Sequence, residues 1–330
     1  MKKGRYFKLF PLLCAVMLPA LGSRAQATLT DHMYAQLNSR TNGASCGSRG
    51  YIGGANTFAT PPVINPDFWL KDVTNIEAQS LGMLSGGNFW VGHYLTAISP
   101  RHCLGVVHTG LVYTNSPSVW ILPNGRLYTN QGIAYRTDGN DAVVVLMAQT
   151  NPFFCRIFPN ATRKIGFWQT PWPQNSYPGF TNCSSPVFVR FHQGVGGIYY
   201  YTNYPWFEPT FISGSPCLGV FQGETNTPLF GDYLDGNGGG HGATTWPGGD
   251  QWIAGDSGGA AYGIVNNEAV FVCAASSAMG GLPPANKLDR LNAMMASLST
   301  NNAAPVYSLS VYDLSGFPDV DANNVPVRRH

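Results

Sequence analysis

The sequence predicts an all-β protein with one helix near its C-terminal end. Short runs rich in β-branched and aromatic residues recur along the chain: NFWVGHYLTAIS, LGVVHTGLVY, SVWILP, DAVVVLM, PVFVRFH, GGIYYYTNY and EAVFVCAAS. Turn signals such as PNG, TDGN, DGNGGG and VNNE separate these runs, and the chain holds 39 glycines and 24 prolines. Many short strands at close spacing favour a sandwich or a barrel over alternating βαβ units.

The first 27 residues have the features of a secretory signal peptide. A basic segment, MKKGRYFK, precedes an apolar one, LFPLLCAVMLPALG, and the stretch ends in the small-x-small pattern of Ala25-Gln26-Ala27. The apolar segment is too short, and too interrupted by proline, to span a membrane. We expect cleavage after Ala27 and a secreted or periplasmic protein, and the short lysine-led leader is typical of bacteria.

Removal of this leader changes the charge of the protein. All five cations of residues 1–27 leave and no acid does, so the formal net charge falls from +2 to −3. A weakly acidic domain offers no electrostatic surface for nucleic acid, so we expect none as a partner. After cleavage we expect no membrane association, and we expect a monomer.

The cysteines are consistent with an exported protein. Six remain beyond Cys14 of the leader: Cys46, Cys103, Cys155, Cys183, Cys217 and Cys273. An even number in such a protein favours disulfides, although the sequence leaves their pairing open. The chain has no CxxC pair and no close His/Cys cluster, so we expect neither a metal site nor a cofactor.

The two ends of the mature chain lack the strand-like pattern of its middle. Residues 28–54 are polar and glycine-rich, which predicts a loosely held arm or a propeptide. Residues 286–298 have helical periodicity behind Asn286 as a candidate cap, and residues 299–330 form a tail. The apolar stripe of this helix consists of Leu288, Leu291, Met294, Met295 and Leu298.

The run QWIAGDSGGAAYG places Ser257 in a glycine-rich turn as a candidate nucleophile. A serine hydroxyl is a weak nucleophile near neutral pH unless a base takes its proton, usually a histidine oriented by a carboxylate. Of the seven histidines, His102 in YLTAISPRHCLGVVH is favoured, because it stands beside Cys103 at a turn after a strand. The others are interpreted as structural or peripheral: His93, His108 and His192 in strand-like runs, His32 in the arm, His241 in a loop, and His330 at the last position.

Asp141 is the favoured carboxylate. It opens the most uniformly apolar run of the chain, where a carboxylate needs a partner such as an imidazole N–H. Asp138, its competitor in the same turn, is interpreted as a solvated turn former.

The segments LTAISPRHCL, NDAVVVL and GDSGGA follow the order His, Asp, Ser and resemble the signature segments of the chymotrypsin/trypsin-like serine proteases. The resemblance covers residues 55–298, and the histidine segment is divergent, with SPRHC where AAHC is usual. It implies two packed six-stranded antiparallel Greek-key β-barrels, over residues 55–155 and 156–285, followed by the helix at 286–298.

The resemblance also implies roles for particular residues. His102 would act as general base and then general acid, Asp141 would orient it, and Ser257 would attack the peptide carbonyl of a protein or peptide substrate. The backbone N–H groups of Gly255 and Ser257 would form the oxyanion hole.

The family's specificity position falls on Gln251, with Asp250 beside it, and the serine that lines the site corresponds to Ser276 or Ser277. Ile52-Gly53-Gly54 weakly resembles the family's activated start. Cleavage before Ile52 would free an ammonium group that could pair with Asp256.

Two other classes of protein remain alternatives. An esterase of the α/β-hydrolase type shares the pattern Gly255-x-Ser257-x-Gly259, but it requires its histidine after the serine, where only His330 stands. A secreted binding or adhesion module that has lost activity would keep the fold, and the many aromatic residues would suit it. The order of the candidate residues favours the endopeptidase over the esterase, and the presence of a candidate for each of the three residues favours it over the inactive module.

Overall fold

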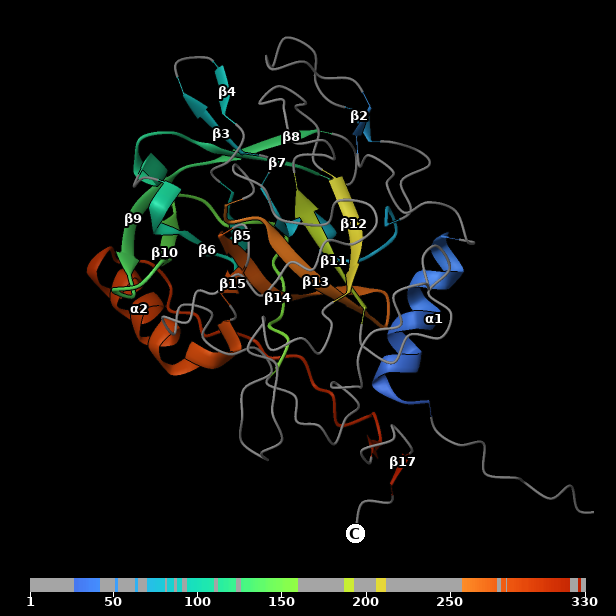
Figure 1. Ribbon diagram of the computed structural model, residues 1–330. Helices are drawn as coiled ribbons and strands as arrows, with labels where there is room; N and C mark the ends of the chain where they lie inside the picture. The colour runs from blue at the N-terminus through green and yellow to red at the C-terminus, as the bar shows by residue number, and fades with distance from the viewer. Residues whose placement is uncertain are drawn as a thin grey trace, which may run out of the picture.

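The computed structural model describes fifteen stretches of the chain. These are residues 27–41, 51–52, 63–64, 70–80, 82–85, 88–90, 94–109, 112–122, 126–159, 187–192, 206–211, 257–277, 280–282, 284–320 and 326–327. The described protein is mostly β, with antiparallel sheets and a helix near its C-terminal end (Figure 1). The predicted fold class is confirmed at this level.

Two four-stranded sheets come from residues 82–147. The first has the order β5-β6-β10-β9, and its strands are Thr96–Ala97, His102–Val106, Ala142–Met147 and Gly132–Thr137. The second has the order β4-β3-β7-β8, and its strands are Asn88–Trp90, Gly82–Ser85, Ser118–Ile121 and Leu127–Asn130. Every residue of β10 is buried, because this strand lies between β6 and β9 and beneath the C-terminal helix.

A five-stranded sheet comes from residues 187–282. It has the order β12-β11-β13-β14-β15, and its strands are Trp206–Phe211, Val187–His192, Ala260–Val265, Glu268–Ser277 and Gly280–Leu282. Asn266 and Asn267 close the hairpin between β13 and β14, both at positive φ, a conformation that asparagine tolerates well. Two short pairs stand apart from these sheets: β1 (Tyr51–Ile52) with β2 (Val63–Ile64), and β16 (Asp319–Val320) with β17 (Pro326–Val327).

Helix α2 (Leu288–Asn301) lies against β9 and β10, where Figure 1 shows it in orange-red. The predicted stripe is confirmed, because Leu291, Met294, Met295 and Leu298 are buried and Leu288 is partly buried against the core. The predicted cap is wrong: Asn286 lies within the 3-10 turn η6 (Pro284–Lys287), and Lys287 occupies the cap position.

Helix α1 (Leu29–Thr41) corrects part of the expectation of a loose arm. Thr28 and Asp31 form a reciprocal capping box, in which the Thr28 hydroxyl donates to Asp31 Oδ2 at 2.8 Å and accepts from the Asp31 N–H at 3.1 Å. Leu29 and Met33 are fully buried, and the helix contacts β13 and β11. Figure 1 shows α1 in blue, on the far side of the sheets from α2.

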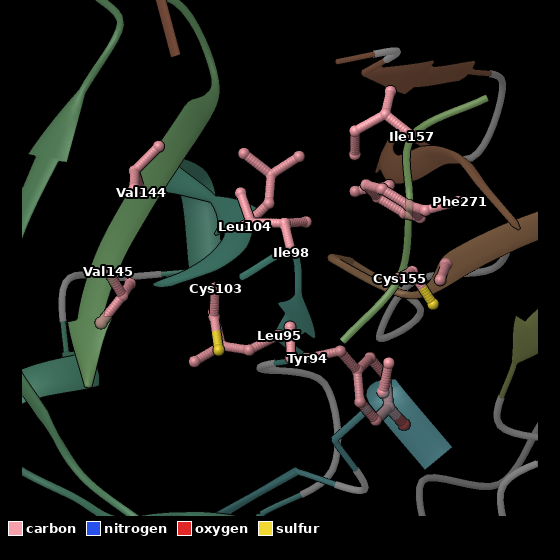
Figure 2. Packing of buried hydrophobic residues seen from close by; sticks show 14 of the residues in the cluster. Tyr94, Leu95, Ile98, Cys103, Leu104, Val144, Val145, Cys155, Ile157 and Phe271 are labelled. Atoms are coloured by element: carbon pink, nitrogen blue, oxygen red, sulfur yellow. The ribbon is translucent and has the colours of Figure 1, made fainter. Parts of the chain in front are cut away.

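One core joins the two sheets of residues 82–147, the first part of the chain, to the sheet of residues 187–282, the second part (Figure 2). Leu104 and Val144 of the first part belong to the same buried cluster as Phe271 of the second. Cys103, Cys155 and Cys273, the three cysteines that the structure describes, are buried as free thiols, and burial raises the pKa of Cys103 and of Cys273 to about 12. The predicted disulfides therefore do not involve these three in this structure, and Cys46, Cys183 and Cys217 lie outside the described residues.

The chain around Ile157 connects both parts to the C-terminal tail. Ile157 forms parallel bridges with Phe271 on β14 and with Val311 of the tail. The Ile157 N–H donates to Ser310 O at 2.7 Å, and the Tyr312 N–H donates to Ile157 O at 2.8 Å. The tail is thus an integral part of the fold over residues 309–314, where Leu309, Tyr312 and Leu314 are buried.

Candidate active site

Ser257 lies in the turn that leads into β13, and this turn is held against Tyr94. Gly258 has a φ of +83°, and a Cβ there would come within 2.3 Å of Tyr94 O. The Tyr94 N–H donates to Ser257 O at 3.4 Å, and the Ala260 N–H donates to Gln79 Oε1 at 2.7 Å. Glycine is therefore required after the serine by both the backbone conformation and the close approach of another segment.

His108 lies in the 3-10 turn η2 (Val107–Thr109), directly after β6. The hydroxyls of Thr109 and Tyr113 each donate to Val106 O at 2.9 Å, and they lie 2.6 Å from each other. Burial raises the pKa of Tyr113 to about 12, so its hydroxyl keeps its proton and remains a donor. These bonds fix the turn that carries the histidine.

Asp141 precedes β10, opposite the end of β6. The antiparallel register pairs Ala142 with Val106, and the Val107 N–H donates to Asp141 O at 2.6 Å. This pairing brings the residue before one strand beside the residues after the other. Asp141 and His108 therefore meet at the same edge of the sheet.

The three side chains form one hydrogen-bonded chain. His108 Nδ1 lies 2.7 Å from Asp141 Oδ2, and His108 Nε2 lies 2.6 Å from Ser257 Oγ. Asp141 Oδ1 also accepts a bond from the His108 backbone N–H at 2.9 Å, so the carboxylate holds both the ring and its main chain. Because a carboxylate only accepts, Nδ1 carries the proton, and Nε2 is left to accept from the serine hydroxyl.

The arrangement is open on one side. The His108 side chain is 43% exposed and that of Asp141 14%, so a molecule in solution can reach the ring while the carboxylate lies behind it. A serine that donates to an unprotonated imidazole nitrogen is set up to lose its proton as it attacks an electrophile. The geometry therefore suits nucleophilic catalysis.

The expectation for His102 is corrected, because its ring lies elsewhere. His102 pairs with Leu146, at the end of β10 away from Asp141, which places it about 16 Å along the strand at roughly 3.3 Å per residue. Its ring is fully buried, with Nδ1 2.9 Å from Ser99 Oγ and Nε2 3.2 Å from Ser299 Oγ. Burial lowers the pKa of His102 from 6.5 to about 4.

The missed residue is His108, which is interpreted from the sequence as structural because it lies within a strand-like run, whereas the structure places it just after β6. One signal in the sequence could have identified it. Asp141 opens its strand, so a partner on an antiparallel neighbour must stand at the end of that neighbour, as in VVHTG, and not at its start, as in SPRHC. The adjacent Cys103 favoured His102, which lies at the other end of the strand from Asp141.

Asp138 also differs from its prediction as a solvated turn residue. Its side chain is fully buried, and its Oδ2 lies 3.0 Å from Lys287 Nζ. Its Oδ1 accepts bonds from the backbone N–H groups of Asn140, at 2.9 Å, and Ala142, at 3.1 Å. The residue is a buried anchor of the turn before β10.

The remaining site residues are only partly described. Ser276 lies in β14, at an irregularity in the pairing of that strand with β15. Gly255, Gln251, Asp250 and Asp256 lie outside the described residues. His93, His241 and His330 lie outside them as well.

Comparison with models of protein families and with curated proteins finds no match for this chain. In the part of the chain that the structure describes, no helix combines the length and apolar character needed to cross a membrane.

Proposed function

We propose that this protein is a secreted serine endopeptidase of the chymotrypsin/trypsin-like kind, with His108 in place of His102 as its base. The hydrogen-bonded chain from Asp141 through His108 to Ser257 is the observation that carries the proposal. The three residues follow one another in the order His, Asp, Ser, as in that family, and the glycines around Ser257 match its most specific segment.

The reaction proceeds in two halves. Ser257 Oγ attacks the peptide carbonyl while His108 Nε2 takes the hydroxyl proton, and the tetrahedral intermediate collapses as the same nitrogen protonates the leaving amine. Water then hydrolyses the acyl-enzyme with His108 again as base. Asp141 keeps the proton on Nδ1 and stabilises the imidazolium that forms in each half.

The oxyanion of each tetrahedral intermediate would be bound by backbone N–H groups. The Ser257 N–H is one donor, and the Gly255 N–H is proposed from the resemblance as the other. The bond from Tyr94 N–H to Ser257 O and the positive φ of Gly258 hold the peptide units on the C-terminal side of the serine. Where the donors of an oxyanion hole are preorganised, they stabilise the transition state by several kcal/mol.

The proposed architecture is two six-stranded antiparallel β-barrels, over residues 55–155 and 156–285, with the catalytic residues between them. In support, the sheet β5-β6-β10-β9 has His108 and Asp141 at the ends of two adjacent strands, and β13 of the five-stranded sheet begins three residues after Ser257. Gln251 and Ser276 remain the proposed pocket residues, and cleavage of a peptide library by the purified protein would define the preferred side chain.

The N-terminus supports a mature chain that starts at Thr28. Cleavage after Ala27 would leave the capping box of α1 intact, whereas cleavage before Ile52 would remove a helix that packs on β13. N-terminal sequencing of the secreted form distinguishes the two, and a start at Ile52 would restore the activation hypothesis.

Labelling with a fluorophosphonate probe tests the function. We expect the secreted protein to react and the Ser257→Ala variant not to react. A folded protein that the probe leaves unlabelled, or labelling that persists in Ser257→Ala, would contradict the proposal and favour a binding module that has lost activity.

A further inference from the structure

A buried ion pair connects helix α2 to the turn that presents Asp141. Lys287 Nζ lies 3.0 Å from Asp138 Oδ2, and the side chains are 11% and 0% exposed. A carboxylate in such a position is destabilising by several kcal/mol unless a counter-charge and hydrogen bonds compensate for lost hydration. Both kinds of compensation are present here.

The second oxygen of Asp138 fixes the shape of the turn. Oδ1 accepts from the N–H groups of Asn140 and Ala142, and the Asp138 N–H donates to Ala142 O at 3.0 Å. The turn passes through Gly139 at a φ of +82°. One carboxylate thus holds the backbone on both sides of Asp141.

Asp141 needs this support because its own bonds have demanding geometry. Its two side-chain oxygens accept from the His108 N–H and Nδ1–H at 2.9 and 2.7 Å, while its carbonyl accepts from Val107 at 2.6 Å. A displacement of the turn by about 1 Å would break this set, and misplacement on that scale can cost about 100-fold in rate.

We propose that Lys287 is a positioning residue for Asp141, acting through the charge of Asp138. The proposal rests on the proposed function for its effect on rate. Without the ammonium group, the buried Asp138 carboxylate loses its counter-charge. It is then drawn toward water, and this movement weakens the bonds that shape the turn.

The test compares phosphonylation of Ser257 by a fluorophosphonate probe in the full-length secreted protein and its variants. We expect Lys287→Met to lower the limiting rate of labelling by 10- to 100-fold, an order of magnitude set by the geometric argument, with little change in the probe concentration for half-maximal rate. Lys287→Arg should restore most of the rate, because it restores the cation.

A double variant separates an action through Asp138 from a direct effect of the lysine. Asp138→Asn with Lys287→Met removes both charges and keeps an amide oxygen that can accept from Asn140 and Ala142. This variant should react at least about tenfold faster than Lys287→Met alone, because no uncompensated charge remains buried. Its folding also keeps the test decisive if Lys287→Met does not fold.

A matched control breaks another ion pair. Glu268→Gln removes the partner of Arg156, which lies outside the candidate active site. It should leave the labelling rate at the wild-type value even where its loss of stability equals that of Lys287→Met. Equal losses of rate in both variants would overturn the proposal in favour of a purely structural role.

The proton resonance of His108 Nδ1–H reports the position of Asp141 without any reaction, and its loss in His108→Gln assigns it. We expect Lys287→Met to shift or broaden this resonance, and Glu268→Gln to leave it unchanged. If the wild type does not react with the probe, the proposed function fails but the resonance still decides the positioning role. An unchanged resonance in folded Lys287→Met would overturn that role.

Discussion

At the scale of single residues, His102 and His108 show how surroundings divide one side-chain type into two tasks. The exposed ring of His108 has a carboxylate on one nitrogen and a serine on the other. The buried ring of His102 has the hydroxyls of Ser99 and Ser299 beside its nitrogens, and it also hydrogen-bonds the backbone of Met295. Ser99 Oγ already accepts N–H bonds from Arg101 and His102. Ser99 therefore donates to His102 Nδ1, and the ring is neutral with its proton on Nε2.

Variants of the two histidines should behave differently. His108→Gln should lower kcat by about 1,000-fold or more, because it removes the base. His102→Gln should keep kcat within about tenfold of the wild type at a temperature where both are folded, since the ring does not reach Ser257. Hydrolysis of a peptide substrate measures both, and a larger loss in His102→Gln would contradict this assignment.

Gly258 gives a second residue-scale prediction. Gly258→Ala should lower the free energy of unfolding by at least about 2 kcal/mol, because alanine at a φ of +83° would also press its Cβ against Tyr94 O. Gly316→Ala is the matched control, since nothing lies within 4 Å of a Cβ at that position. Urea unfolding of both variants checks the difference, and equal midpoints would contradict it.

At the scale of elements, α2 lies along β10 and is fastened near both ends. Lys287 bonds Asp138 before β10 begins, and Ser299 bonds His102, which pairs with the far end of that strand. A helix of 14 residues and a strand of 6 have similar lengths, about 21 and 20 Å. The helix thus supports the strand along its whole length.

The burial of His102 makes stability depend on pH. The pKa of His102 is about 4 in the folded protein and 6.5 without burial. As the pH falls below 6.5, the unfolded chain therefore binds a proton at this histidine, whereas the folded protein does not bind it until about pH 4. The free energy of unfolding should therefore fall by up to about 3 kcal/mol over this interval. His102→Gln should lose this contribution, and urea unfolding at pH 7, 5.5 and 4.5 compares the two slopes; parallel slopes would contradict the argument.

Local patterns in the sequence predicted the elements better than their partners. The apolar run of β10 and the stripe of α2 both repeat with the period of their structure, so strand and helix follow from the residues alone. Helix α1 was missed because its polar sequence has few apolar positions, although its capping box was readable. The pairing of β6 with β10 is a long-range property that the sequence does not show directly. Without knowledge of this pairing, the choice between His102 and His108 depended on the residues adjacent to each histidine.

At the scale of the whole molecule, the tail closes the junction between the two parts of the chain. Tyr312 is central to it: the Arg156 guanidinium lies 4.1 Å from the centroid of its ring, and Asn266 donates to its hydroxyl at 2.9 Å. Tyr312→Ala should therefore lower the free energy of unfolding by about 2–4 kcal/mol. Val306→Ala, at a position that is 59% exposed, should change it by less than about 0.5 kcal/mol. Thermal unfolding measures both, and similar melting temperatures would contradict a structural role for the tail.

The position of Lys287 and Ser299 in the chain has a consequence for the order of events during synthesis. Lys287 bonds Asp138 and Ser299 bonds His102, and both of these partners leave the ribosome much earlier. Ser310 likewise bonds the earlier residue Ile157. A chain that has been made only as far as Ser257 still lacks Lys287, Ser299 and Ser310, and contacts of such sequence separation also form late in folding. If the proposed activity is present, it would arise only when the chain is nearly finished, which would keep partly made molecules from attacking the cell that produces them.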